Sequence, residues 1–162
     1  MCLYSRKTPI EAEEDIHVWK VVSVDGCPPY YSDFKYEKGK VHVPTEAPVV
    51  REAIYDGSGV YKYEWGWLHS YSDKTRAIEM AETLAMQKAV SYGESGCMHV
   101  IELVIPKGAK YVAEGDEIAS DALEWEEDAK GLEVWYEPFY EELESPVKGR
   151  TKLRYRLRHE II

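Results

Sequence analysis

The sequence predicts an α+β fold, mostly antiparallel sheets packed with one main helix at about residues 72–92. One long segment has helical spacing, whereas at least six others are rich in β-branched and aromatic residues. Strands and helices do not alternate regularly, which argues against a parallel sheet. A chain of 162 residues fits one domain over residues 1–162 and buries roughly 70% of its unfolded surface.

The helix is the clearest element. Ser72 or Asp73 supplies its N-cap, and Gly93 ends it after Tyr92. Between them, small apolar residues recur at three- and four-residue spacing, which predicts close packing against a sheet. These are Ala77, Ile78, Ala81, Leu84, Ala85 and Ala89.

The strands are expected on both sides of this helix. A polar arm, residues 1–15, should lead the chain as a loop, and Pro138 should break the strand at 132–140. The other strands are expected at 16–24, 97–105, 109–113, 118–125 and 151–160.

Charge is distributed unevenly along the chain. The net charge is −10, yet residues 113–145 hold 13 acidic residues and one basic residue, a balance of −12, which leaves +2 for the rest. In 150–158, five bases alternate with Leu153, Tyr155 and Leu157, the pattern of a strand with one buried face. We expect this basic ladder to neutralise part of the acidic segment, the alternative being a partner-binding stripe.

The same composition excludes several classes of protein. An acidic chain is a poor general binder of phosphate backbones, so no direct nucleic acid partner is expected. There is no apolar run long enough for a membrane span and no signal-peptide pattern. Three cysteines, Cys2, Cys27 and Cys97, suit a reducing compartment, so a cytoplasmic location is expected.

Motifs for metal, nucleophile or phosphate chemistry are weak. Cys97 and His99 are two residues apart, but no C-x-x-C or H-E-x-x-H motif is present. We therefore interpret both as ordinary half-buried strand residues and expect no metal site. No G-x-S-x-G elbow is present, and Gly57-Ser58-Gly59 lacks the Lys-Ser/Thr of a phosphate loop.

An aromatic segment precedes the helix. A strand through this segment would place Tyr61, Tyr63, Trp65 and Trp67 on one face. These rings are either core residues or a platform on which a ligand stacks. As a ligand site, the segment would use Tyr63, Trp65, Trp67, His69, Ser70 and Ser72.

The order of motifs around the helix resembles a known family. Ser70-Tyr71-Ser72 leads into the helix, the strand at 100–105 follows, and Pro106-Lys107-Gly108 then precedes Ala119-Ser120-Asp121. This order, over about 66–125, resembles the middle and end of the ADP-ribosyltransferase fold, where a Ser-x-Ser element precedes a helix and a later loop carries the catalytic Glu. The 106–121 pattern also looks like small uncharacterised proteins of phages and gut bacteria.

The resemblance implies a set of candidate catalytic residues. His17 or Lys20 would stand where the family has an NAD-contacting Arg or His, and Ser70 would match the Ser-x-Ser pair. The Glu-x-Glu element is replaced here, which leaves Glu117 and Asp121 as candidate carboxylates (Glu124 is a further substitute). A shorter Asp misplaces the carboxylate, and misplacement on that scale can cost roughly 10²-fold in rate.

Three functions follow as alternatives. The first is a non-catalytic module on an ADP-ribosyltransferase-like scaffold, which binds a protein partner or a nucleotide-like small molecule and needs no cofactor. The second is a divergent transferase that uses NAD. The third is an interaction or inhibitor protein, of the kind phages encode, whose acidic segment imitates a nucleic-acid backbone.

Overall fold

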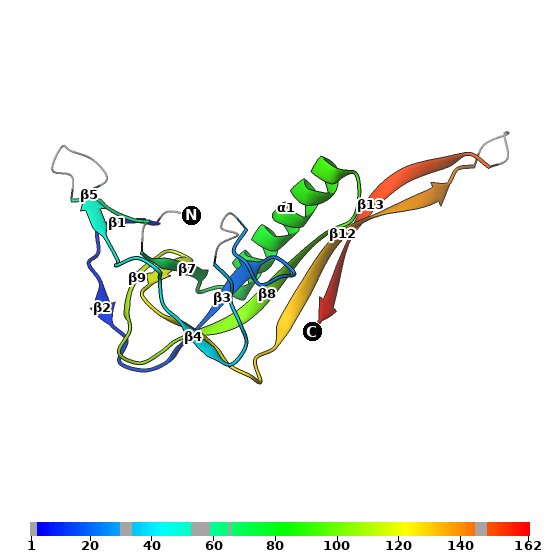
Figure 1. Cartoon of the computed structure of the whole chain (residues 1–162). Helices are drawn as coiled ribbons and strands as arrows, with labels where there is room; N and C mark the ends of the chain where they lie inside the picture. Colours follow the sequence, from blue (N-terminus) through cyan, green and yellow to red (C-terminus); the bar gives the residue numbers. More distant parts are fainter. Residues whose placement is uncertain (1–2, 30–33, 53–58, 65, 145–148) are drawn as a thin grey trace.

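The computed structural model describes residues 3–29, 34–52, 59–64, 66–144 and 149–162. It confirms an α+β architecture dominated by antiparallel sheet, with one helix among the described residues (Figure 1). A ten-stranded sheet has the order β13-β12-β8-β3-β7-β10-β9-β2, with β4 and β11 beside this path, and a three-stranded sheet has the order β1-β6-β5. The elements are β1 (Leu3–Ser5), β2 (Ile10–Glu11), β3 (Ile16–Val22), β4 (Lys40–His42), β5 (Val50–Glu52), β6 (Tyr61–Tyr63), β7 (Leu68–Tyr71), α1 (Lys74–Tyr92), β8 (Gly96–Ile105), β9 (Lys110–Glu114), β10 (Glu117–Ser120), β11 (Leu123–Trp125), β12 (Gly131–Glu142) and β13 (Thr151–Ile161).

Helix α1 forms as the sequence predicts. Asp73 is the N-cap, since its side chain accepts a hydrogen bond from the Thr75 N–H at 2.8 Å, and Gly93 ends the helix at φ 66°. The helix buries an alanine stripe, Ala77, Ala81, Ala85 and Ala89. Small side chains let the helix approach the sheet closely. Within the part of the chain that the structure describes, no helix has the length and apolar character to cross a membrane.

Strand β8 lies at the centre of the sheet and separates two cores. On one face, Met98 and Val100 pack with the helix alanines. On the other face, Ile101 and Leu103 pack with Tyr36, which comes from the loop before β4. Both faces of β8 are therefore buried, which explains why its sequence is almost continuously apolar.

The sheet divides between β3 and β7. These strands share a single paired position, Trp19 with Tyr71, whereas β3 pairs with β8 over seven positions. Beyond that one bridge the two strands separate. Backbone groups on the facing edges consequently need other partners.

The β12–β13 hairpin extends away from the rest of the molecule (Figure 1). Pro138 lies inside β12, so the expected break is wrong. Pairing of β12 with β8 ends at Tyr136, so at Pro138 the strand pairs only with β13, and a proline is tolerated in a strand with one free edge.

The basic ladder pairs with acidic residues across the hairpin, as expected. Glu137 lies 3.3 Å from Arg156 and 3.1 Å from Arg158, and Glu141 pairs with Arg154. These arginines lower the pKa of Glu137 through hydrogen bonds and charge. Part of the acidic segment is thus neutralised within the molecule.

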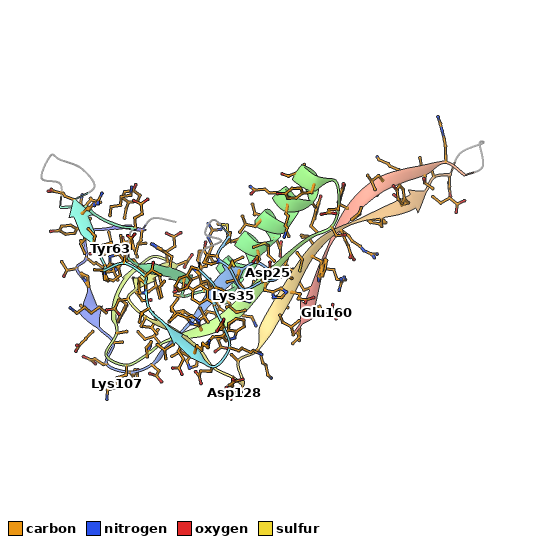
Figure 2. All side chains as sticks on the ribbon, in the orientation of Figure 1. Asp25, Lys35, Tyr63, Lys107, Asp128 and Glu160 are labelled. Atoms are coloured by element: carbon orange, nitrogen blue, oxygen red, sulfur yellow. The ribbon has the colours of Figure 1, made fainter. Side chains whose placement is uncertain are left out.

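The N-terminal arm is more ordered than its polarity suggests. Residues 3–5 form β1 and pair with β6, and residues 10–11 form β2 and pair with β9. The expectation of a loop is wrong at these positions, because Leu3 is buried beside Tyr63 and anchors the arm. Tyr63 lies at the end of the molecule that carries β5 and β1, whereas Glu160 lies on β13 near the C-terminus, far from the tip of the hairpin (Figure 2).

Candidate functional site

A cleft of about 500 Å³ opens where β3 and β7 separate. One side is formed by Lys20 and Val21 of β3, and the other by Leu68 and His69 of β7. Its volume falls in the range of about 300–1,000 Å³ that is usual for small-molecule sites. The cleft thus follows directly from the division of the sheet.

Lys20 lies in this cleft as a buried amine. Its side chain is 7% exposed, and its ammonium group donates a hydrogen bond to the backbone carbonyl of His69. This bond satisfies an acceptor on β7 close to where the strands diverge. The Nζ atom also lies 5.5 Å from the centre of the Tyr36 ring, a cation–π contact. Burial lowers the pKa of Lys20 from its ordinary 10.5 to about 8.

His69 provides a second buried polar group. Burial and the charge of Lys20 lower the pKa of its imidazole from 6.5 to about 3, so the ring is neutral at pH 7. One hydrogen bond joins the ring to the backbone of Glu64. The other ring nitrogen, Nε2, is buried without a hydrogen-bond partner among the described residues. Such an atom is costly in a folded protein unless a ligand or water satisfies it.

The walls of the cleft are mainly apolar. Aromatic and aliphatic side chains surround the two polar groups, and the rest of the lining is three carboxylates, Glu46, Glu64 and Glu117, with Thr45 and Gly66. Glu64 is within 2.9 Å of Lys62, which offsets its charge. The apolar lining comprises Val21, Pro28, Pro29, Phe34, Tyr36, Pro44, Trp67, Leu68, Tyr71, Met80 and Leu84.

The structure brings together only some of the predicted catalytic residues. Lys20 and Glu117 line the cleft. His17 is exposed and pairs with Glu102 at 2.8 Å instead. Asp121 accepts a hydrogen bond from the Lys110 N–H at 2.9 Å and so holds a turn outside the cleft. Of the two candidate carboxylates, Glu117 is therefore the one that lines the same cleft as Lys20.

The predicted ligand-binding residues also divide. Trp67 and His69 line the cleft. Tyr63 does not, because it is fully buried against Trp67 with ring centres 5.2 Å apart. The expected continuous strand is interrupted after Tyr63, and Trp65 lies outside the described residues.

The two predicted serines, Ser70 and Ser72, lie outside the cleft lining. Ser70 is completely buried in β7, and its Oγ has no hydrogen-bond partner within the described segments. Ser72 is exposed directly before the helix cap, and its N–H donates to the carbonyl of Asp116 at 2.9 Å.

Several lining residues were missed from the sequence. Phe34 and Tyr36 lie in an irregular stretch before β4, and their rings contact each other at 5.0 Å between centres. The only signal was aromatic residues next to Pro28-Pro29. Glu64 was likewise missed, since it follows a short strand that has no distinguishing motif.

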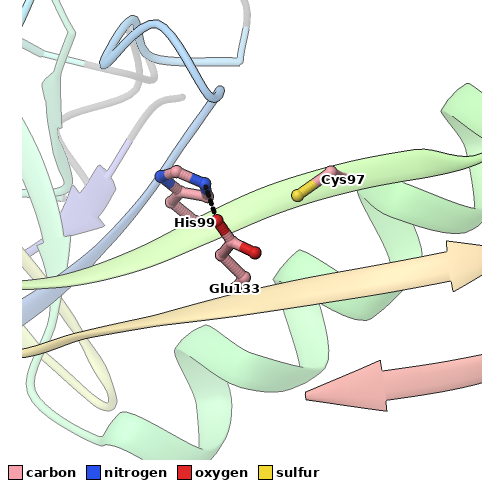
Figure 3. A group of neighbouring side chains, drawn as sticks. All are labelled: Cys97, His99 and Glu133. Atoms are coloured by element: carbon pink, nitrogen blue, oxygen red, sulfur yellow. Dashed lines mark ion pairs between the residues drawn. The ribbon is translucent and has the colours of Figure 1, made fainter. Parts of the chain in front are cut away.

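A second group of reactive side chains lies on β8 and β12. Cys97, His99 and Glu133 place their ligating atoms within 4.8 Å of one another (Figure 3). Burial, with a smaller effect from the charge of Glu133, raises the pKa of Cys97 from 9.0 to about 11. The sequence separated Glu133 from the other two by more than thirty positions, so only the strand pairing joins them.

Comparison of the chain with protein-family models, with curated proteins and with solved structures finds no significant match.

Proposed function

We propose that the chain is a non-catalytic binding module whose cleft takes a nucleotide-like small molecule. One observation carries the proposal: Lys20, with a buried ammonium group, and His69, whose Nε2 has no hydrogen-bond partner among the described residues, line one mainly apolar cleft of about 500 Å³. A buried charge and an unsatisfied ring nitrogen both cost stability. Proteins retain such groups most often where they bind something.

The chemistry of the lining fits the parts of a nucleotide. Lys20 donates to a phosphate or carbonyl oxygen, and a neutral His69 accepts from an N–H or O–H of the ligand. The rings of Phe34 and Trp67 and the adjoining prolines provide apolar surface for a planar base. The Glu117 carboxylate accepts hydrogen bonds from ribose hydroxyls.

The sequence resemblance suggests which ligand to test first. The order of motifs over about residues 66–125 resembles that of the ADP-ribosyltransferase fold. In that fold a nucleotide cofactor is the ligand. The resemblance therefore motivates NAD and its fragments as the first compounds to test.

Calorimetric titration of the full chain with NAD, ADP-ribose and AMP tests the proposal. We expect at least one of them to bind. Lys20→Met should weaken binding about tenfold or more, because a hydrogen bond to a charged group is worth about 1.5–3 kcal/mol. His17→Gln is the matched control, since His17 is on the same strand but exposed.

Three results would contradict this function. One is the absence of heat with all three nucleotides. Another is equal affinity in the wild type and the Lys20→Met variant. The third is an equal loss in the His17→Gln control, which would show that the effect is not specific to the cleft.

A divergent NAD-dependent transferase is a second candidate, favoured by Glu117. Its carboxylate shares the cleft with Lys20, where it could stabilise positive charge that develops on the nicotinamide ribose. Incubation with labelled NAD and a cell lysate should then give labelled product. Glu117→Gln should abolish the label and Asp121→Asn should keep it. Absence of label in the wild type would contradict this candidate.

The acidic-mimic alternative has less support. Glu137 and Glu141, which this function would need free, face arginines across the hairpin. The pairing favours neutralisation within the molecule over display to a basic partner.

A further inference from the structure

Strands β8 and β12 bring together a thiol, an imidazole and a carboxylate. Cys97 and His99 are two residues apart on β8 and so share a face. Glu133 of β12 is paired directly with His99, and Trp135 is paired with Cys97. Figure 3 shows the side chains of Cys97, His99 and Glu133 turned toward a common space between the two strands.

The distances suit a small tetrahedral metal ion. The ligating atoms lie within 4.8 Å of one another, and His99 Nε2 is 3.4 Å from Glu133 Oε1. Zn²⁺ bonds of about 2.0–2.3 Å at tetrahedral angles place ligand atoms about 3.4–3.6 Å apart. The histidine and the carboxylate already have this separation, and the Cys97 sulfur lies within 4.8 Å of both.

The ligand atoms also lack competing partners. Apart from the contact with Glu133, which is too long for a good hydrogen bond, His99 Nε2 has no partner among the described residues. Cys97 is 5% exposed, and its Sγ contacts the carbonyl of Met98 only at 4.0 Å. Among the described residues, the imidazole and the thiol are therefore not committed to another strong hydrogen bond.

A neighbouring group holds the carboxylate in place. Trp135 Nε1 donates to Glu133 Oε2 at 2.9 Å, which leaves Oε1 facing His99. Hydrogen bonds of this kind from outside the ligand set orient metal ligands. Their loss typically lowers metal affinity about 10–100-fold.

We propose that Cys97, His99 and Glu133 form a Zn²⁺ site. The mixture of sulfur, nitrogen and oxygen donors matches Zn²⁺, whereas Mg²⁺ and Ca²⁺ prefer oxygen alone. Three protein ligands leave the fourth position to water or an external ligand. None of the three residues lines the nucleotide cleft, so this site is independent of the proposed function.

Cobalt substitution of the full-length protein tests the site. Added Co²⁺ should give the visible bands of a tetrahedral ion and a thiolate charge-transfer band, with one ion per chain, and Zn²⁺ should displace it. Cys97→Ser should remove the charge-transfer band, while Cys27→Ser, which changes a cysteine outside the cluster, should leave it unchanged. Glu133→Gln keeps an acceptor for Trp135 but should weaken Zn²⁺ binding at least tenfold.

Trp135→Phe separates the role of the orienting hydrogen bond from that of the ligands. It should lower Zn²⁺ affinity about 10–100-fold while the cobalt charge-transfer band persists at saturating metal. The proposal is overturned if Co²⁺ gives no thiolate band. It is also overturned if the band survives Cys97→Ser or disappears equally in Cys27→Ser. Thermal melting of each variant verifies that the protein is folded.

Discussion

Replacing Lys20 by methionine tests how the molecule maintains a charge in its cleft. Methionine has nearly the same length and shape but carries no charge. Lys20 is 7% exposed, and burial lowers its pKa from 10.5 to about 8. Each pKa unit corresponds to about 1.4 kcal/mol, so keeping the buried amine charged at pH 7 costs roughly 3 kcal/mol. The variant avoids this cost but loses the hydrogen bond to the His69 carbonyl, which offsets about 1–3 kcal/mol of the gain in stability.

The sign of the pH dependence follows from proton binding. Between pH 8 and 10.5 the lysine is protonated in the unfolded chain and largely neutral in the folded one. The unfolded state then binds more protons, so the free energy of unfolding of the wild type rises with pH through this window. Lys20→Met lacks this titration. The wild type should therefore gain roughly 3 kcal/mol relative to the variant between pH 7 and 10.5.

Urea denaturation at several pH values from 7 to 10.5 measures this difference. Subtracting the variant from the wild type removes the contributions of the other lysines and tyrosines, which both proteins share. A difference in unfolding free energy that stays constant across the range would refute the reasoning. It would mean that Lys20 keeps an ordinary pKa in the folded protein.

Three further predictions concern other parts of the fold. Gly96→Ala should lower the free energy of unfolding, measured in urea, by about 1–3 kcal/mol or more, because an added Cβ would lie 1.9 Å from the Ala85 carbonyl oxygen. A stability equal to wild type would be evidence against close packing of the helix on the sheet. Glu137→Gln should lower the melting temperature at pH 7 and not at acid pH, because the contribution from a depressed pKa is lost as the carboxylate protonates; an equal effect at both pH values would contradict the ion pairs with Arg158. Cys97 should react with iodoacetamide much more slowly than an unfolded control at pH 8, since its pKa is raised to about 11, and equal rates would show an accessible thiolate.

Much of the fold could be predicted because local signals agreed with tertiary structure. The alanine spacing and Asp73 defined α1. The alternation in residues 151–158 correctly predicted strand β13, but the expectation that its apolar face is buried is wrong, because Leu153 and Leu157 are exposed on the extended hairpin. The break expected at Pro138 was wrong because a proline is tolerated where β12 has a free edge, and that depends on where its pairing with β8 ends. The loop expected for the N-terminal arm was wrong because one buried residue, Leu3, orders a segment that is otherwise polar.

The candidate sites were less predictable because each depends on a pairing between distant segments. The cleft exists since β3 and β7 share one paired position, and no local pattern encodes that separation. Lys20 and Glu117 were candidates from the resemblance, but only the fold could choose between Glu117 and Asp121. The approach of Glu133 to His99 similarly depends on the register of β12 against β8.

The most direct test of the central claim is an amide NMR titration of the full chain with NAD and ADP-ribose. The account predicts that perturbed resonances cluster around the cleft, at 20–21 on β3, at 66–71 on and before β7, and at 45–46 in the loop between β4 and β5. It predicts no change on the β12–β13 hairpin. Saturating nucleotide without perturbation at Lys20 and His69, or with perturbation confined to the hairpin, would contradict it.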